Sequence, residues 1–265
     1  MEILVCVKRV PMVGGKIVVT ADGQDVDTRM SGFTVSPHEE CAVEEAVRLV
    51  EQHGGGVTVL TLGPSAAADQ LRDMLALGAT RAELLETAGR EWGPIATAEA
   101  IVAAARRARD SEGRPYDLLL FGNEAADTGD YQVGVRVAHA LGLPCVTGIK
   151  NLEVTVADTG SSARARREYR GTEEIYDIPL PAVVSVKEGI NLPRYPSLPG
   201  RLRAKRATIE QSAPPWLGAQ WHPEGLRKEQ LRVPAGETKR AEILGTGAGA
   251  VPALVALLDE LGVLS

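Results

Sequence analysis

Short apolar runs alternate with amphipathic segments along most of the chain. Runs that are wholly or mostly apolar, typical of strands buried on both faces, occur at residues 3–7, 57–62, 82–85 and 118–121, of which 118–121 is apolar throughout. Segments with helical spacing of apolar residues lie between or behind them, at 36–53, 65–77, 94–109 and 130–141. This alternation predicts a doubly wound α/β fold with a mostly parallel sheet.

The sequence around Ser36 has the residues that typically begin a helix. Ser36 is a good N-cap, Pro37 suits the first turn, and Glu39 supplies the acidic third residue of a capping box. Glycines at 54–56 end this helix.

The pattern changes after about residue 150. Alternating segments at 152–156, 163–169 and 173–178 predict an added antiparallel section, followed by a last buried strand at 181–186. A small hairpin is expected nearer the start, at 16–20 and 25–28 around Asp22-Gly23. Beyond Lys187 the α/β pattern ends, so we expect a nucleotide-binding α/β domain over 1–200.

Residues 201–265 predict an extended C-terminal arm. The basic run Arg201–Arg206 is followed by a Pro-, Gly- and Ala-rich stretch containing Trp216 and Trp221, then by a short amphipathic helix over Val251–Leu261. The arm has too few apolar residues to form a core of its own. We therefore expect it to pack on the body or on a partner, and the body to fold without residues from about 207 onward.

The stretch from Gly122 to Gly134 is the best candidate for a binding site. It follows the buried run 118–121 and opens onto a helix, which is where ligands bind in open α/β sheets. Backbone N–H groups at a helix start attract phosphate, so we expect a nucleotide phosphate at 129–134. Asp127 and Asp130 can accept from ribose hydroxyls, or Asp130 can simply cap the helix. An ordinary strand–loop–helix connection is the alternative.

Composition narrows the class of protein. The net charge of −6 argues against nucleic-acid binding, and with 4% aromatic residues base-stacking platforms are not expected. The three cysteines have no CxxC spacing, which favours a reducing compartment and no structural zinc. The first residues enter a strand pattern at once, and no apolar run approaches a membrane span. We expect a cytoplasmic protein that is not embedded in a membrane.

Motifs for catalysis are missing from the sequence. There is no G-x-S-x-G, HExxH, Walker A loop or G-x-G-x-x-G, and no pair of carboxylates suggests an acid–base couple. The four histidines are scattered, and only His38 lies at the expected ligand edge. A site shaped for a nucleotide without catalytic residues points to a binding or carrier function rather than an enzyme.

Three stretches together resemble the β subunit of electron-transfer flavoproteins. Val5–Pro11 is similar to the opening strand with its V-K-[RQ]-V ending, and Ser36–Ala46 is similar to N-P-x-x-x-x-A-V-E-E-A. Residues 184–199 resemble the long signature V-x-x-x-x-N-x-P-R-Y-x-x-L-P, which runs into x-A-K. The resemblance covers nearly the whole chain, including Ala241–Gly245 and Leu257–Val263 in the tail. It implies a Rossmann-like fold related to adenine-nucleotide hydrolases.

The resemblance also implies a function. Members are αβ heterodimers that carry electrons from flavoprotein dehydrogenases, such as acyl-CoA dehydrogenases, to a quinone oxidoreductase. The redox FAD lies mostly in the α subunit, with one wall from the β subunit, which buries a structural AMP. By motif position, the cofactor contacts would be Cys6, Ser36, Pro37, His38, Glu39, Leu62, Gly122, Asn123, Asp127, Thr128, Gly129, Asp130, Tyr131, Gln132 and Val133.

A second set of residues resembles the loop that recognises dehydrogenases. It consists of Asn191, Leu192, Pro193, Arg194, Tyr195 and Leu198. The leucine that anchors the partner would be Leu198 or Leu192. The C-terminal arm would be the segment that wraps the α subunit.

Several positions depart from the family pattern. His38 and Val13 stand where members often have aromatic residues near the flavin, and Ser36 stands where many have Asn. A neutral His38 can donate to the flavin, and a protonated one can stabilise negative charge on it. In bifurcating members a second FAD replaces AMP; this chain shares Gln132-Val133-Gly134 with their loop, but Tyr131 puts bulk where an extra flavin would pass, which favours AMP. Hydrolases, amide ligases and nucleotide-sensing proteins share the fold, but their Gly-rich motifs are missing here.

Overall fold

The computed structural model describes residues 1–12, 17–29, 31–89, 92–111, 113, 115–157, 160–214, 228–234 and 243–264. Its chain divides into two units, Met1–Leu231 and Arg232–Ser265, and each is treated by itself. Val13, Lys16, Trp216, Trp221, His222, Ala241 and Glu242, which entered the sequence predictions, lie outside the described residues.

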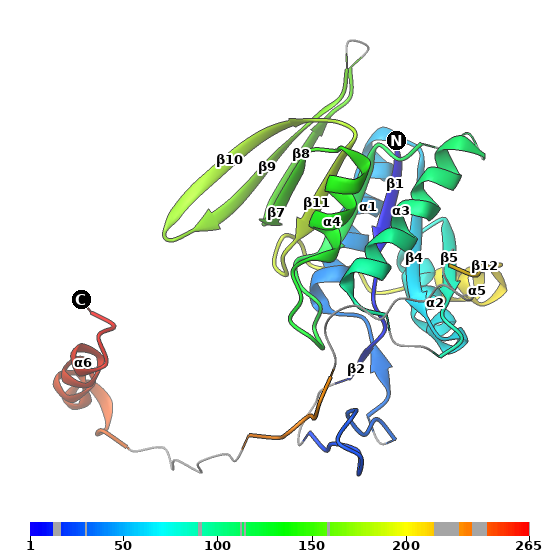
Figure 1. Cartoon of the computed structure of the whole chain (residues 1–265). Coiled ribbons are helices and arrows are strands. Elements are labelled where there is room, and N and C mark those ends of the chain that lie inside the picture. The colour runs from blue at the N-terminus through cyan, green and yellow to red at the C-terminus, as the bar shows by residue number, and fades with distance from the viewer. Residues whose placement is uncertain are drawn as a thin grey trace. The chain divides into compact units, whose positions relative to one another are not determined.

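The first unit is built on a seven-stranded parallel sheet with the order β12-β5-β4-β1-β6-β11-β7 (Figure 1). The strands are β1 (Glu2–Cys6), β4 (Gly56–Gly63), β5 (Arg81–Glu86), β6 (Leu118–Gly122), β7 (Cys145–Ile149), β11 (Ala182–Val186) and β12 (Glu210–Ser212). All the predicted apolar runs are strands of this sheet, so the expected doubly wound α/β fold is confirmed.

Helices cover both faces of this sheet. They are α1 (Pro37–His53), α2 (Ala68–Leu77), α3 (Pro94–Asp110) and α4 (Val133–Leu141), and a 3₁₀ turn, Ser65–Ala67, precedes α2. Successive side chains of a strand point to opposite faces. Accordingly Ile3 and Val5 of β1 pack into one buried cluster with α1 and α2, whereas Leu4 and Cys6 pack into a second cluster with α3 and α4.

The antiparallel section is a separate three-stranded sheet of order β10-β9-β8, as predicted. Its strands are β8 (Asn151–Thr155), β9 (Ser162–Tyr169) and β10 (Thr172–Pro179). Short strands β2 (Val10–Pro11) and β3 (Phe33–Thr34) pair near the start of the chain. The predicted hairpin is present as a single antiparallel bridge between Val19 and Val26, with Gly23 at a φ of 68° in its turn.

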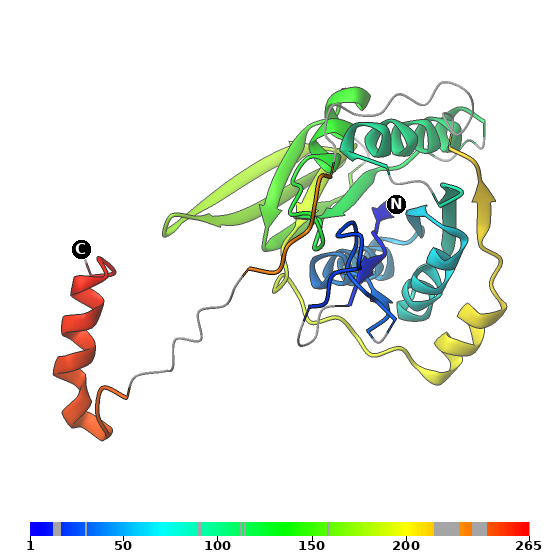
Figure 2. The same cartoon turned by 60° about the horizontal axis from the view of Figure 1, so that its bottom comes forward.

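The α/β body continues past Lys187, where the sequence pattern suggested its end. Helix α5 (Leu198–Arg206) packs against α2, and β12 then adds a parallel strand beside β5 at the edge of the sheet (Figure 2). The sequence shows no apolar helical pattern here, because basic residues form the exposed face of α5 and only Gly200 and Ala204 are buried. A Cβ at Gly200 would lie 2.7 Å from the Ala76 carbonyl oxygen, so the close approach of α5 needs this glycine.

This finding corrects the expectation about deletion. A chain that ends near residue 207 would lose β12 from the sheet, because β12 pairs with β5 through Ser212. The expected boundary at residue 200 falls inside the unit Met1–Leu231.

The second unit contains the short turn η2 (Gly247–Ala250) and helix α6 (Val251–Glu260), close to the helix predicted there. None of the described residues of this helix is buried, although most of them are apolar. In the parts of the chain that the structure describes, no helix is both long enough and apolar enough to cross a membrane.

Candidate functional site

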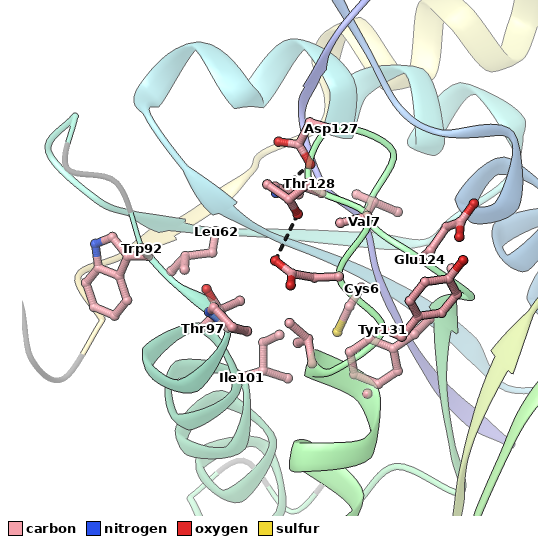
Figure 3. A pocket seen from close by; sticks show the side chains of 18 of the residues that line it. Cys6, Val7, Leu62, Trp92, Thr97, Ile101, Glu124, Asp127, Thr128 and Tyr131 are labelled. Carbon is pink, nitrogen blue, oxygen red and sulfur yellow. Dashed lines mark hydrogen bonds and ion pairs between the residues drawn. The ribbon is translucent and has the colours of Figure 1, made fainter. Parts of the chain in front are cut away.

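A cavity of about 930 Å³ opens at the carboxyl ends of β1, β4 and β6 (Figure 3). It lies at the edge where ligands bind in doubly wound sheets. Its walls include ten of the fifteen cofactor contacts expected from the sequence: Cys6, Glu39, Leu62, Gly122, Asn123, Asp127, Thr128, Asp130, Tyr131 and Val133. The volume is near the top of the range for ligand pockets, about 300–1,000 Å³.

One wall of the cavity is apolar. Leu60, Leu62 and Phe121 come from the strands and Ile101 from α3. Burial raises the pKa of the Cys6 thiol well above its ordinary value, so this side chain stays protonated and contributes apolar surface. A planar base can pack against such a wall.

The loop between β6 and α4 holds its shape through its own hydrogen bonds. The Ala125 N–H donates to the Asp130 carbonyl at 3.0 Å, and the Gly129 N–H to the Ala125 carbonyl at 2.8 Å. Gly129 has a φ of 68°, a left-handed conformation that favours glycine. The loop therefore presents its polar side chains from a defined backbone.

Asp130 does not cap the following helix, which corrects one of the two expectations for it. Its carboxylate accepts from the Thr128 hydroxyl at 2.9 Å and from the Gln132 amide at 3.3 Å, inside the loop. Helix α4 begins at Val133 with Gln132 as N-cap, three residues later than predicted. Asp130 stands two residues before the N-cap Gln132 and is therefore not at the capping position.

The uncapped start of α4 faces the cavity. The N-cap residue Gln132 makes no side-chain hydrogen bond to the helix start, and Val133, Gly134 and Val135 all line the cavity. The first backbone N–H groups of a helix have no partner within the helix. Together with the helix dipole they favour an anion at this end.

Lysines and carboxylates share the mouth of the cavity. The Lys8 ammonium lies 2.7 Å from the Asp127 carboxylate, and the Lys228 ammonium 3.3 Å from Asp25. Glu39 and Glu124 add further acidic groups to the lining. Among the described residues, no group of three or more His, Cys, Asp and Glu side chains could hold a metal ion.

Glu39 is the most buried of the acidic residues that line the cavity. Its carboxylate accepts the Ser36 N–H at 3.2 Å and the Lys8 N–H at 3.0 Å, while the Ser36 hydroxyl accepts the Glu39 N–H at 3.3 Å. The predicted capping box is therefore formed. Burial raises the pKa of the Glu39 carboxyl to about 8, and the hydrogen bonds from Ser36 and Lys8 offset part of that effect.

The other five expected contacts do not line the cavity. They are Ser36, Pro37, His38, Gly129 and Gln132. The His38 Nδ1 accepts the Glu188 N–H at 2.7 Å, and its Nε2 lies 3.5 Å from the Glu124 carboxylate. His38 thus joins the loops after β6 and β11, next to the cavity rather than within it.

Sequence reasoning missed one side of the cavity. Thr97 and Ile101 of α3, with Trp92 just before this helix, line the cavity on the side of α3 (Figure 3), and Lys228 is a further lining residue. These residues belong to no motif. Only the position of α3 behind β5, next to the ligand edge, could have pointed to them.

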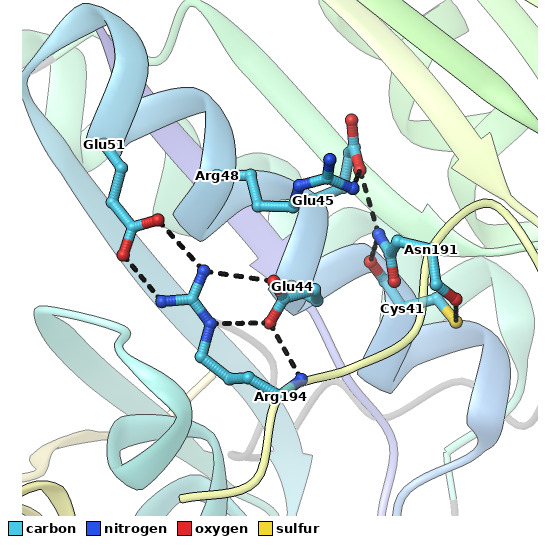
Figure 4. Close-up of polar contacts among 7 residues, drawn as sticks. All are labelled: Cys41, Glu44, Glu45, Arg48, Glu51, Asn191 and Arg194. Atoms are coloured by element: carbon cyan, nitrogen blue, oxygen red, sulfur yellow. Dashed lines mark hydrogen bonds and ion pairs between the residues drawn. The ribbon is translucent and has the colours of Figure 1, made fainter. Parts of the chain in front are cut away.

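A second feature is the loop from Asn191 to Leu198. Leu192, Tyr195 and Leu198 are 90%, 95% and 72% exposed, whereas Asn191 and Arg194 bond to helix α1 (Figure 4). Pro193 lies between them and is partly buried. The loop therefore turns apolar side chains outward and polar side chains inward.

Comparison with known proteins gives consistent results. Residues 26–216 match the sequence model of the electron transfer flavoprotein domain. The chain is 36% identical over 212 residues to the "Electron transfer flavoprotein subunit beta" of Bacillus subtilis (strain 168), which covers 80% of this chain and 78% of the relative.

Relatives from other groups show similar identity. "Protein FixA" of Azorhizobium caulinodans is 34% identical over 79% of this chain and 74% of its own length. The mitochondrial "Electron transfer flavoprotein subunit beta" of Oryza sativa subsp. japonica is 34% identical over 81% of this chain and 82% of its own. The family match over residues 26–216 includes every strand of the seven-stranded sheet except β1, together with the cavity loop and the exposed loop at 191–198.

Proposed function

The chain belongs to the β-subunit family of electron transfer flavoproteins, and on this basis we propose that it binds a structural AMP in the cavity and pairs with an α subunit. Its role is that of an electron carrier subunit. Electrons pass from flavoprotein dehydrogenases, such as acyl-CoA dehydrogenases, through the FAD held mainly by the α subunit, to a quinone oxidoreductase.

The start of α4 is the observation that best supports a nucleotide. Its uncapped first turn lines the cavity, and Lys8 lies at the mouth, so a phosphate group meets backbone N–H groups and a cation. The apolar wall with Leu62 and Ile101 suits an adenine base. Asp127 has a carboxylate available for ribose hydroxyls once a phosphate draws Lys8 away.

The choice between AMP and a second FAD depends on Tyr131. Its side chain lines the cavity and is 60% exposed, so it stands at the rim. A flavin attached to the nucleotide would have to pass this ring. A cavity of about 930 Å³ is large enough for either nucleotide, so the rim rather than the volume favours AMP.

The FAD of the α subunit would meet this chain near His38. In the structure the Nδ1 atom accepts the Glu188 N–H, which leaves the proton on Nε2 as the one that the ring can donate. That proton points toward Glu124 and is the one available to a flavin. A positively charged ring would have to give up the hydrogen bond from Glu188.

Docking and assembly use two other parts of the chain. We assign Leu192, Tyr195 and Leu198 to the surface that meets dehydrogenases, with Leu198 or Leu192 as the anchor. The unit Arg232–Ser265 is the arm that packs on the α subunit, since the apolar side chains of α6 lack a core of their own.

Mass spectrometry of the nucleotide released on denaturation is the direct test. We expect AMP from the purified chain, and a yellow colour only when the α subunit is present. Release of FAD by the isolated chain would favour the bifurcating alternative. Turnover of ATP by the isolated chain would contradict a carrier role and point to an enzyme of the same fold.

A further inference from the structure

The exposed loop carries the two most exposed large apolar side chains among the described residues, Leu192 and Tyr195. Leu198 follows at the first position of α5. Apolar groups that a chain leaves in water at one place mark a surface that a partner covers. Such a surface binds more tightly when its side chains are already held in place, because less entropy is lost on binding.

The backbone of this loop does little to hold it. Over residues 187–197, its own backbone makes one long hydrogen bond, from the Ile190 N–H to the Lys187 carbonyl at 3.4 Å. The order of the loop must therefore come from contacts with the rest of the body.

Arg194 supplies the strongest of these contacts (Figure 4). Its Nε and Nη2 donate to the two Glu44 oxygens at 2.8 and 3.0 Å, and its Nη1 and Nη2 donate to the two Glu51 oxygens at 2.6 and 3.0 Å. The Arg194 backbone N–H also donates to Glu44, at 3.2 Å. One guanidinium is thus bound on two edges by carboxylates two turns apart on α1.

Burial of Glu44 makes its ion pair with Arg194 costly to break. The Glu44 side chain is 6% exposed, so its charge needs Arg194 as a partner, whereas the Glu51 side chain is 58% exposed. The two carboxylates raise the pKa of Arg194 above its already high ordinary value, and the guanidinium stays charged.

Asn191 provides a second fixed point three residues earlier. Its amide donates to the Cys41 carbonyl at 3.0 Å and to the Glu45 carboxylate at 2.9 Å. Farther along, Ser197 caps α5, and Arg72 of α2 donates to the Ala204 carbonyl at the other end of that helix at 2.9 Å. Arg194 lies between these anchors, next to the outward-facing Tyr195.

We propose that Arg194 is a positioning residue for partner docking: bound to Glu44 and Glu51, it holds Leu192, Tyr195 and Leu198 in the arrangement that a dehydrogenase binds. This inference rests on the proposed function of the loop. Arg194 itself points at α1, away from the docking surface. Its effect is to remove the entropy loss that ordering the loop would otherwise add to binding.

Electron transfer from an acyl-CoA dehydrogenase of the same organism to the αβ complex is the test. Arg194→Gln should raise the KM for the αβ complex about tenfold and leave kcat unchanged, because the docked geometry is the same once formed. Arg194→Lys should fall in between, since one ammonium cannot bridge two carboxylates in the manner of a guanidinium. Arg48→Gln is the matched control, because Arg48 lies on α1 between Glu44 and Glu51 and pairs with Glu45 at 3.6 Å rather than with Arg194; the KM of this variant should not change.

Leu198→Ala separates this inference from the proposed function. If neither Leu198→Ala nor Leu192→Ala raises KM, the docking surface itself is wrong. If either raises KM and Arg194→Gln does not, the docking surface stands and the positioning role is overturned. Should Arg194→Gln fail to fold, Glu51→Gln decides, because it leaves the buried Glu44 pair in place. We expect it to raise KM about threefold and to speed amide exchange at 192–197; unchanged KM and exchange would overturn the proposal.

Discussion

The backbone N–H of Lys8 donates to the Glu39 carboxylate at 3.0 Å, which joins the end of β1 to the first turn of α1 behind the cavity. The same carboxylate also accepts the Ser36 N–H. A single buried acid therefore fixes the start of α1 and the back of the candidate nucleotide site. Protonation of Glu39 should therefore change the free energy of unfolding of the whole domain.

Stability should fall with rising pH because of Glu39. Burial raises the pKa of this carboxyl in the folded chain to about 8, against an ordinary value of 4.5. Between these values the folded state keeps a proton that the unfolded state has released, so the free energy of unfolding decreases by up to about 1.4 kcal/mol per pH unit as pH rises. Urea unfolding from pH 5 to 8 should show this slope in the wild type.

Glu39→Gln isolates this effect from other titrating groups. The variant should be less stable than the wild type at pH 5 by about 1–3 kcal/mol, since an amide cannot accept both N–H groups equally well. The difference between the two proteins should shrink as pH rises. A difference that stays constant from pH 5 to 8 would show that Glu39 keeps an ordinary pKa.

Lys8 should contribute to nucleotide affinity. We expect Lys8→Met to weaken AMP binding to the nucleotide-free chain about tenfold, because it removes one charge-assisted hydrogen bond from the mouth of the cavity. Calorimetry measures the change, with Lys187→Met as the control, since Lys187 follows β11, two strands from β1, without lining the cavity. Equal affinities in the wild type and Lys8→Met would place the phosphate away from Lys8.

Gly122 should not tolerate a side chain. A Cβ there would lie 2.7 Å from the Glu39 Cγ, which is buried and held by its own hydrogen bonds. Gly122→Ala should therefore cost about 1–3 kcal/mol in unfolding free energy. Gly129→Ala has open space around it and should cost only about 1–2 kcal/mol for its left-handed φ of 68°. A smaller loss at Gly122 than at Gly129 would mean that α1 can move away from β6.

The two ring nitrogens of His38 should have separate effects, Nδ1 on the loop after β11 and Nε2 on the flavin. His38→Ala removes the acceptor for the Glu188 N–H, while His38→Asn can keep it, so amide exchange at Glu188 should speed up only in the first variant. In the αβ complex, loss of the Nε2 proton should shift the flavin potential by roughly 30 mV if it donates to the flavin. Unchanged potentials in both variants would remove His38 from the flavin site.

The arm should be needed for assembly and not for folding. A chain that ends at Leu231 keeps the whole first unit, so its unfolding free energy should stay within about 0.5 kcal/mol of the full chain. Its affinity for the α subunit should fall at least about a hundredfold, because each buried Leu or Val of α6 contributes about 1.5–3 kcal/mol. Sedimentation of the αβ mixture measures the loss; a truncated chain without a cooperative unfolding transition would refute this division of roles.

Much of the fold follows from local pattern. The strand at 118–121 is apolar throughout, and the one at 57–62 is apolar apart from Thr58 and Thr61, because both faces of the sheet are covered. The Ser36 capping box sets the start of α1. Helix α5 escaped detection because its buried face consists of Gly200 and Ala204, which carry almost no hydrophobic signal. Short strand β12 has a polar sequence and depends on pairing with β5.

The candidate site was predictable only in part, because some of its residues carry no signal in the sequence. The loop from Gly122 to Val133 has composition and position in its favour, whereas Trp92 and Thr97 reach the cavity because α3 lies beside it. Asp130 looks like a helix cap in sequence, yet its bonds to Thr128 and Gln132 give it another role. Side-chain competition of this kind is decided by three-dimensional geometry, which spacing along a chain does not contain.

The length of helix α1 also sets the distance between the cavity and the exposed loop. Glu39 borders the cavity near its start, and Glu51 holds Arg194 near its end, twelve residues later, which is about 18 Å along a helix with a rise of 1.5 Å per residue. A dehydrogenase docked on the exposed loop would be held at a set distance from the nucleotide. Inserting or removing one turn would change that distance by about 5.4 Å while leaving each end intact. The length of this one helix would then determine the distance between a docked dehydrogenase and the bound nucleotide.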